Sequence, residues 1–326
     1  MLLYIVASVV VAVVAVAALA TQRVPAWDFP TSTVFLTGGS EGIGLEIARE
    51  LVRRKVRHLV IGARREAVLS AAVSKLESLA ATCGSPTQVS YVVVDVAEEE
   101  SVAKAVQTVE QRVGGKVNLL ICNAGFAHPA RFMDSSLADA KRMMNVNYFG
   151  CLNLMWALMP GMIEQKRGRV VLTSSLVARA PIAGYTLYSA TKAGLRAFAH
   201  STDMENSCLG VRVQVVSPPD VETPGFEEEN KVKSPECAAI SAFGGSKPFS
   251  AEAMGKAVVQ GIEHYKFDIT LGSDGWFVSH GSAGLEPATS VVDLLTECLL
   301  SGPLRLGLAA MSAIHYNIVK RVRCKK

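Results

Sequence analysis

Short apolar runs and longer helix-like stretches alternate along the chain from residue 31 to about residue 271. The short runs are rich in β-branched residues and several are apolar almost throughout, which is typical of strands buried on both faces of a parallel sheet. Stretches with helical spacing, such as 45–55 and 67–81, separate them. This alternation predicts an α/β fold, a single doubly wound Rossmann-type domain with a parallel sheet, over residues 31–275. The expected strands are 33–36, 58–61, 89–94, 117–121, 169–172 and 211–216.

The chain begins with an apolar run, MLLYIVASVVVAVVAVAALA, and Arg23 is its first charged residue. Such a run is long enough to cross a hydrocarbon core of ~30 Å as a helix. A cleaved signal peptide is the alternative, and residues 18–20 fit a cleavage site, but the basic region that should precede the apolar run is missing. We expect a transmembrane anchor over residues 1–23. Arg23 on its distal side favours a cytosolic location for the domain that follows.

A second apolar region lies within the last part of the chain, residues 276–326. Three interruptions leave no apolar stretch longer than 306–314, which is too short to span a bilayer alone. The end, residues 320–326, is strongly basic. We expect a hydrophobic, re-entrant or interfacial segment whose basic end lies on anionic cytosolic lipid. An ordinary domain-packing helix with a solvated tail is the alternative. The interrupting residues are Glu297, Pro303 and Arg305.

Composition narrows the class of protein. A length of 326 residues suggests about two domains, but the α/β pattern alone accounts for about 240 residues as one domain. The 50% hydrophobic share excludes a disordered chain. The net charge of +4 lies largely at the C-terminus, which argues against a nucleic-acid-binding protein. The seven cysteines are scattered and form no CxxC motif, so neither a disulfide framework nor a metal site is indicated, and a reducing compartment is favoured.

A glycine-rich turn, TGGSEGIG over residues 37–44, follows the first strand directly and opens a helix. Gly38 permits the tight turn, Gly42 lets the backbone approach a pyrophosphate, and Gly44 allows close packing of helix on strand. The helix N-terminus offers unpaired N–H groups to phosphate. The turn therefore predicts a dinucleotide site. Its candidate contacts are Gly38, Ser40, Glu41, Gly42, Ile43 and Gly44.

The end of the second strand indicates which nicotinamide cofactor binds. An NAD site has an acidic residue about 20 positions after the glycine turn, to bind the ribose hydroxyl. This chain has Arg64 and Arg65 there, and guanidinium groups pair with a 2′-phosphate, so NADP(H) is favoured over NAD(H). A solvated arginine pair is the alternative. Asp95, after the third strand, is a candidate for the adenine amino group, and Asn123–Gly125 is either a close approach to the cofactor or a plain turn.

Candidate catalytic residues follow the fifth strand. Tyr188 and Lys192 stand at i and i+4, on one face of a helix. A free tyrosine titrates near ~10, and a neighbouring positive charge brings its pKa toward the range needed for proton transfer to a carbonyl. The spacing alone is also common in surface helices. Ser174 and Ser175 close the preceding strand, where a hydroxyl can bind a carbonyl, and Asn147 is a polar residue in an apolar helical segment.

Five motifs, taken together, resemble the short-chain dehydrogenase/reductase family over residues 31 to about 270. The resemblance implies that Tyr188 donates the proton and that Lys192 lowers its pKa and holds the nicotinamide ribose. It also implies that Ser175, for which the adjacent Ser174 can be mistaken, orients the carbonyl, and that Asn147 anchors a water. Helices near Asn147 and Tyr188 form the usual pairing surface of the family, which makes a homodimer possible. The motifs are Thr37–Gly44, Asn123–Gly125, Asn147, Ser175 and Tyr188–Lys192.

A narrower likeness is to the 3-ketodihydrosphingosine reductases, carried by residues 217–230, residues 271–275 and the apolar ends of the chain. It implies NADPH-dependent reduction of a long-chain sphingoid ketone, 3-oxosphinganine, to sphinganine at the endoplasmic reticulum membrane, with the active site in the cytosol. The acidic run 227–229 either binds the substrate's ammonium or is a solvated face. Two alternatives stay open: a membrane-bound reductase of a steroid, retinoid or 3-oxoacyl thioester, and a non-catalytic NADP-binding scaffold.

Two positions depart from the family pattern. Most members have Pro-Gly after the sixth strand, whereas this chain has Pro218 and Pro219, as the narrower group does. Glu41 replaces the small serine that is common in the glycine turn, which weakens one phosphate contact but leaves the glycines intact.

Overall fold

The computed structural model describes residues 11, 13–19, 21–22, 24–243 and 247–323. Most of the expected N-terminal anchor, residues 1–23, lies outside the described residues, although residues 13–19 are helical. The last three residues of the expected basic end also lie outside them.

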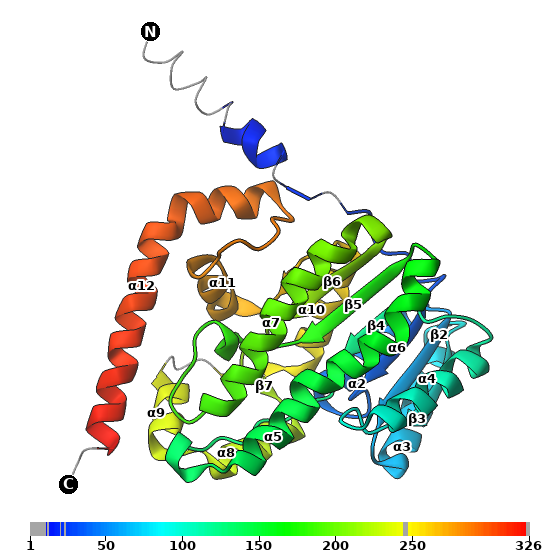
Figure 1. Ribbon diagram of the computed structural model, residues 1–326, viewed down its shortest axis with the longest axis horizontal. Helices are drawn as coiled ribbons and strands as arrows, with labels where there is room; N and C mark the ends of the chain where they lie inside the picture. Colours follow the sequence, from blue (N-terminus) through cyan, green and yellow to red (C-terminus); the bar gives the residue numbers. More distant parts are fainter. Residues whose placement is uncertain (1–10, 12, 20, 23, 244–246, 324–326) are drawn as a thin grey trace.

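The centre of the molecule is a parallel sheet of seven strands in the order β3-β2-β1-β4-β5-β6-β9 (Figure 1). The six strands expected from the sequence are confirmed, with ends that agree within two residues. The seventh strand, β9, has only two residues, too few to give a sequence signal. The strands are β1 (Thr33–Thr37), β2 (His58–Ala63), β3 (Gln88–Val93), β4 (Leu119–Cys122), β5 (Gly168–Thr173), β6 (Val211–Val216) and β9 (Asp268–Ile269).

Helices cover both faces of this sheet, and each face has its own apolar core. Val34 and Leu36 of β1 belong to one core, whereas Phe35 belongs to the other, because successive side chains of a strand point to opposite faces. The first core is closed by α2 (Gly42–Arg53), α3 (Glu66–Thr82) and α10 (Ala251–Glu263). The second is closed by α4 (Glu99–Val113), α6 (Gly150–Glu164) and α7 (Thr186–Asn206). The doubly wound α/β fold is confirmed.

The order of the strands fixes where a ligand can bind. The chain leaves β1 toward β2 on one side and returns to β4 on the other, so the order reverses between β1 and β4. In parallel α/β sheets the crevice outside the carboxyl ends of the strands at this point is the usual ligand site. Thr37, the last residue of β1, pairs with Gly62 and Cys122, so the segments after β1, β2 and β4 leave the sheet at the same edge.

Short elements surround that edge of the sheet (Figure 1). They include α5 and the π-helical η2 before α6, η3 after β5, and the segment between β6 and α10. Their bounds are η1 (Phe132–Asp134), α5 (Leu137–Met144), η2 (Asn145–Phe149), η3 (Leu176–Ala178), β7 (Val221–Glu222), α8 (Pro224–Val232), α9 (Pro235–Phe243) and β8 (Phe249–Ser250). The short η4 (Ser207–Leu209) lies at the opposite edge, just before β6.

The C-terminal region forms two helices, α11 (Gly272–Gly281) and α12 (Val291–Arg323), and the expected boundary after residue 275 falls inside α11. The helix α12 runs along one side of the molecule, packed against α11 and α9 (Figure 1). Within the described residues it is the one helix long and apolar enough to cross a membrane, by length and composition. The uninterrupted apolar stretch 306–314, which is too short to span a bilayer alone, is only one part of this longer helix. Pro303 lies inside the helix without ending it, and the few charges do not outweigh the apolar residues around them.

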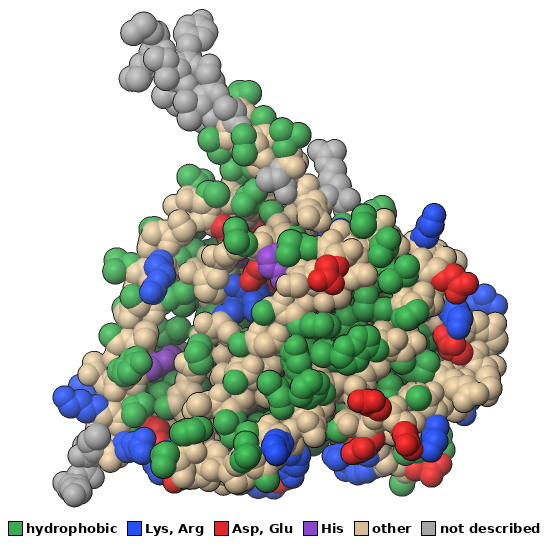
Figure 2. Space-filling model, viewed as in Figure 1, with side chains coloured by type: hydrophobic (Ala, Val, Ile, Leu, Met, Phe, Trp, Pro, Cys, Tyr) green, Lys and Arg blue, Asp and Glu red, His purple; other side chains and the backbone are tan. Residues whose placement is uncertain are grey.

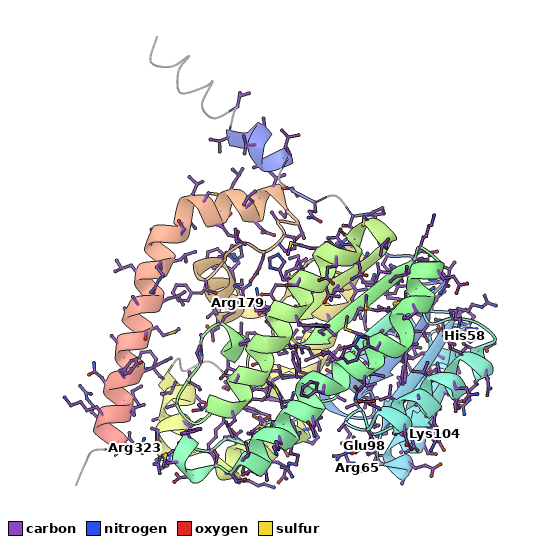
Figure 3. The ribbon with its side chains drawn as sticks, in the orientation of Figure 1. His58, Arg65, Glu98, Lys104, Arg179 and Arg323 are labelled. Carbon is purple, nitrogen blue, oxygen red and sulfur yellow. The ribbon has the colours of Figure 1, made fainter. Side chains whose placement is uncertain are left out.

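A buried ion-pair network joins this region to the α/β domain. Arg179, just after η3, lies between α7 and α11 (Figure 3), and its guanidinium is 2.9 Å from Asp268 of β9. Arg196 of α7 is 3.0 Å from the same carboxylate. Both arginines also pair with Glu286, which precedes α12. Removing one member of such a network leaves buried charges unpaired, so the network fixes the C-terminal region to the loop that follows β5.

Candidate active site

A cavity of about 710 Å³ opens at the carboxyl edge of the sheet, within the usual size range of ligand sites. It brings together the glycine turn, the ends of β2 to β5, the first turns of α7, and α8. Two of the candidate residues, Gly44 and Asn147, are not among its lining residues. Those that do line it are Gly38, Ser40, Glu41, Gly42, Ile43, Arg64, Arg65, Asp95, Asn123, Ser174, Ser175, Tyr188 and Lys192.

The glycine turn has the tight geometry that its sequence predicts. Gly38 and Gly42 have φ values of 66° and 54°, which L side chains rarely adopt. A Cβ on Gly44 would lie 2.0 Å from the Gly38 carbonyl oxygen, so α2 packs directly on the turn. Asn123 holds the same carbonyl, since its Nδ2 donates to the Gly38 oxygen over 3.2 Å. This bare backbone at the start of α2 fits the pyrophosphate of a dinucleotide.

The two arginines after β2 have different surroundings. Arg65 pairs with Glu41 of the glycine turn, so the glutamate that departs from the family pattern has a local partner. Arg64 is exposed at the cavity, and among the described residues no ion pair involves it. His58 and Arg65, labelled in Figure 3, mark the two ends of β2, and the arginines lie at the end that faces the cavity. A free guanidinium there fits the 2′-phosphate of NADP(H).

Replacing Arg64 by Ala is expected to raise the KM for NADPH at least about tenfold while changing the KM for NADH by less than about twofold. The reason is the loss of a charge-assisted bond worth about 1.5–3 kcal/mol, which only the phosphorylated cofactor makes. Steady-state kinetics with both cofactors measure this. Arg57→Ala, an exposed arginine just before the opposite end of β2, is the matched control and should change neither KM. Equal effects of Arg64→Ala on the two cofactors would contradict the assignment.

Tyr188 and Lys192 meet at the cavity on the first turns of α7. The Lys192 Nζ lies 5.6 Å from the centroid of the Tyr188 ring and donates to the Thr173 carbonyl oxygen at 2.6 Å. Ser175, at the N-cap of η3, accepts a hydrogen bond from the Val177 N–H at 3.3 Å, and its hydroxyl is also hydrogen-bonded to Tyr188. The three side chains that the sequence singles out are thus brought together.

The electrostatics of Tyr188 differ from the expectation. Burial raises the pKa of its phenol, the negative charges of Glu229 and Asp220 raise it further, and only the hydrogen bond with Ser175 lowers it. The prediction that a neighbouring lysine brings this pKa down is wrong for the protein without ligand, because desolvation of the phenolate outweighs the attraction. Burial likewise lowers the pKa of Lys192 to about 8. Tyr188 is therefore protonated at neutral pH, the form that a proton donor needs.

The two adjacent serines, Ser174 and Ser175, make different contacts. The Ser174 hydroxyl donates to the Lys192 carbonyl oxygen over 2.9 Å and its side chain is buried, so it ties β5 to α7. Ser175 bonds with Tyr188 instead. The geometry therefore favours Ser175 over Ser174 for contact with a substrate carbonyl.

Asn147 lies in the π-helical turn η2, fully buried. Its Oδ1 accepts from the Phe126 N–H at 3.0 Å, and its Nδ2 donates to the Phe126 carbonyl at 2.9 Å and to the Thr191 hydroxyl at 3.2 Å. The amide thereby holds the segment after β4 against α7, beside Lys192. π-Helical turns are frequent at functional sites. The water expected at Asn147 stays a prediction.

Tyr185 is not among the residues that the sequence predicts for the site, and Glu229 is predicted there only as one member of the acidic run 227–229. The Tyr185 hydroxyl donates to the Glu229 carboxylate at 3.0 Å, and the Tyr185 ring packs on the Tyr188 ring with centroids 5.6 Å apart. Glu229 belongs to the acidic run in α8. The helical spacing distinguishes Glu229 within this run. Residues 226 and 229 are three apart and share the half-buried face of the helix, whereas residues 227 and 228 are exposed.

Replacing Lys192 by Met is expected to stabilise the ligand-free protein at pH 7 by about 2 kcal/mol. The pKa of Lys192 falls from 10.5 to about 8 on folding. At about 1.4 kcal/mol for each pKa unit, the buried charge costs about 3 kcal/mol, and the lost hydrogen bond to Thr173 takes back about 1 kcal/mol. The gain is present below about pH 8 and disappears as the pH rises toward 10.5, where half of the unfolded lysine is also neutral. Urea unfolding of both proteins from pH 7 to pH 10.5 measures this, and a gain independent of pH would contradict it.

The family model for short chain dehydrogenases matches residues 32–234. Together with the fold and the grouping of Ser175, Tyr188 and Lys192, this shows that the chain belongs to the short-chain dehydrogenase/reductase family. The resemblance seen in the sequence is confirmed.

Curated relatives narrow the comparison. The chain is 33% identical over 299 residues to the 3-dehydrosphinganine reductase of Danio rerio, covering 90% of this chain and 88% of that protein. It is 31% identical over 297 residues to the 3-ketodihydrosphingosine reductase of Bos taurus, covering 91% and 88%. Among solved structures it is similar to a short-chain dehydrogenase from Sphingobium yanoikuyae in complex with NADPH. That likeness has a TM-score of 0.62 at 25% identity and covers 73% of this chain and 87% of that one.

Proposed function

We propose that this protein reduces 3-oxosphinganine to sphinganine with NADPH, a step of sphingolipid biosynthesis. The observation that carries the proposal is the likeness, over about nine tenths of the chain, to reductases named for this ketone. The Tyr188, Lys192 and Ser175 grouping supports a carbonyl reductase. The exposed Arg64 at the cavity, together with the NADPH-bound relative, supports the cofactor.

The cavity fits this cofactor and this reaction. The glycine turn and the α2 N-terminus would hold the pyrophosphate, Arg64 the 2′-phosphate, Asp95 the adenine end and Lys192 the nicotinamide ribose. When bound, NADPH supplies the hydride for the carbonyl carbon.

The protein's own groups act at the carbonyl oxygen. Ser175 and Tyr188 hold this oxygen between two hydroxyls, and Tyr188 gives its proton to the oxygen as negative charge develops there. The Lys192 charge stabilises the phenolate that Tyr188 becomes. Asn147 keeps Lys192 and the segment after β4 in place.

The proposal includes a membrane location, the endoplasmic reticulum with the catalytic domain in the cytosol. Exposed apolar side chains along α12, such as Leu299 and Leu306, and the basic residues of its last turn support a tail over 276–326 that lies in or on lipid. Residues 1–23 would add an anchor. Each CH₂ of an alkyl chain taken from lipid into water costs about 0.8 kcal/mol, so an enzyme held at the bilayer spares its long-chain substrate most of that cost.

A homodimer is part of the same proposal. Figure 2 shows hydrophobic side chains gathered over α6 and α7. The exposed apolar side chains of this part of the chain include Trp156 of α6, Met204 of α7 and Phe149, which directly precedes α6. An apolar patch of this kind on a solvent-exposed surface is typical of a protein–protein interface. These are also the helices that the family resemblance implies for the contact between two subunits.

The function is tested with the full chain purified in detergent. Sphinganine formation and NADPH oxidation are followed with 3-oxosphinganine, a steroid ketone, retinal and a 3-oxoacyl thioester as competing substrates. We expect the highest kcat/KM for 3-oxosphinganine. A higher value for another carbonyl would replace the proposed substrate, and no turnover of any of them, with NADPH still bound, would favour a non-catalytic scaffold.

A further inference from the structure

The cavity carries opposite charges at its two ends. Arg64 and Arg65 follow β2, whereas Glu229 lies beside α7, which follows β5, and the strands β1 and β4 separate the two places. Asp220, which follows β6, also lines the cavity. The cationic end matches the phosphates of the cofactor. The acidic end, at the catalytic tyrosine, has no task in the reduction described above.

Glu229 is turned into the cavity by the periodicity of α8. Its neighbours in the acidic run, Glu227 and Glu228, are exposed; Glu227 does not line the cavity, and Glu228, which lies at its rim, is paired with Lys231. Glu229 is half-buried and accepts the Tyr185 hydroxyl at 3.0 Å. One carboxylate oxygen is therefore fixed by a neutral donor, and among the described residues no ion pair involves Glu229.

Tyr185 connects Glu229 to the proton donor, Tyr188. Tyr185 and Tyr188 are three residues apart at the start of α7, and their ring centroids are 5.6 Å apart. The charge of Glu229 reaches both catalytic side chains: it raises the pKa of Tyr188, in addition to the effect of burial, and it opposes the lowering of the pKa of Lys192 by burial. A cation bound between Glu229 and Tyr188 would be attracted by the carboxylate and placed next to the reacting carbonyl.

We propose that Glu229 is the residue that binds the ammonium group of the substrate, with Asp220 adding negative charge to the same subsite. This inference rests on the proposed function. In 3-oxosphinganine the amino group is on the carbon next to the carbonyl. When Tyr188 binds the ketone oxygen, the ammonium group therefore lies close to this tyrosine. The Glu229 carboxylate is one contact away from that tyrosine, because it accepts the hydroxyl of Tyr185, whose ring packs on the Tyr188 ring. Charged hydrogen bonds are the stronger ones in proteins, and this one distinguishes an amino ketone from a plain ketone.

The experiment compares 3-oxosphinganine with 1-hydroxyoctadecan-3-one, which has the same chain, hydroxyl and ketone but no amine. Glu229→Gln keeps the shape of the side chain and an acceptor for Tyr185, and removes the charge. We expect it to raise the KM for 3-oxosphinganine about tenfold to a hundredfold, and to change the KM for the deamino ketone by less than about twofold. Glu229→Asp, which keeps the charge on a shorter side chain, should give an intermediate KM for the amino ketone.

Glu227→Gln is the matched control, because Glu227 is an exposed glutamate of the same helix that does not line the cavity. It should leave both KM values unchanged. Equal losses of Glu229→Gln on the two ketones, or no loss on either, would overturn the inference and leave the proposed function standing. The same holds if the wild-type protein prefers the deamino ketone. Turnover of neither ketone by the wild-type protein would overturn the proposed function and this inference with it.

Discussion

Tyr188→Phe is expected to lower kcat for ketone reduction by about 10²- to 10⁴-fold, the usual contribution of a positioned general acid. The substitution removes one oxygen and leaves the ring that packs on Tyr185. The cavity keeps its shape, but the alkoxide that forms on the substrate no longer receives a proton, and Ser175 loses its partner. The cofactor contacts at the glycine turn and Arg64 are untouched, so NADPH affinity should stay within about twofold.

The measurement combines steady-state rates with NADPH binding, followed by quenching of protein fluorescence. Tyr316→Phe, an exposed tyrosine on α12, is the matched control and should behave as the wild-type protein. A Tyr188→Phe variant that keeps most of its kcat would show that another group protonates the substrate. A variant that also loses NADPH binding would show that the cavity itself had changed.

Gly44→Ala is expected to weaken NADPH binding by at least about a hundredfold and to lower the free energy of unfolding by about 2–3 kcal/mol. The new Cβ would lie 2.0 Å from the Gly38 carbonyl oxygen and 2.6 Å from the Asn123 Nδ2. The carbonyl belongs to the backbone of the turn and cannot move aside without shifting α2 from the turn. Overpacking costs about 1–3 kcal/mol and occasionally more. A 2.0 Å contact with backbone is an extreme case, so a net loss of about 2–3 kcal/mol remains after the ~1 kcal/mol gained by replacing a helical glycine.

Fluorescence titration with NADPH and urea unfolding measure the two effects. Gly115→Ala is the control, since nothing lies within 4 Å of the Cβ it would add. Its affinity and stability should match those of the wild-type protein. Wild-type affinity in Gly44→Ala would mean that close packing of α2 on the turn is not required for the cofactor.

The sequence predicts much of this molecule because its strands are buried on both faces. Runs such as 33–36 are apolar or β-branched throughout, and a strand buried on both faces of a parallel sheet needs that composition. The motifs lie at the ends of such strands, so fixing the strands also fixes the edge where the motifs meet. For that reason the glycine turn, Arg64, Asn123, Ser175 and Tyr188 all line one cavity.

Other features depend on packing that no local pattern encodes. Ser174 and Ser175 are chemically equal neighbours, and only the extended backbone at the end of β5 turns one toward Lys192 and the other toward Tyr188. The pKa of Tyr188 is set by how deeply it is buried. The full length of the tail helix is not evident from the sequence, because a proline usually interrupts a helix, whereas α12 continues through Pro303.

The central claim is that Tyr188 protonates the oxygen of a sphingoid ketone reduced at C3 in this cavity. Its most direct test is mass spectrometry of the product formed from 3-oxosphinganine with NADPH deuterated at either face of nicotinamide C4. The account predicts sphinganine with one deuterium at C3 from one of the two labelled cofactors, formed far more slowly by Tyr188→Phe. Sphinganine without label from both cofactors, or no sphinganine at all, would contradict it.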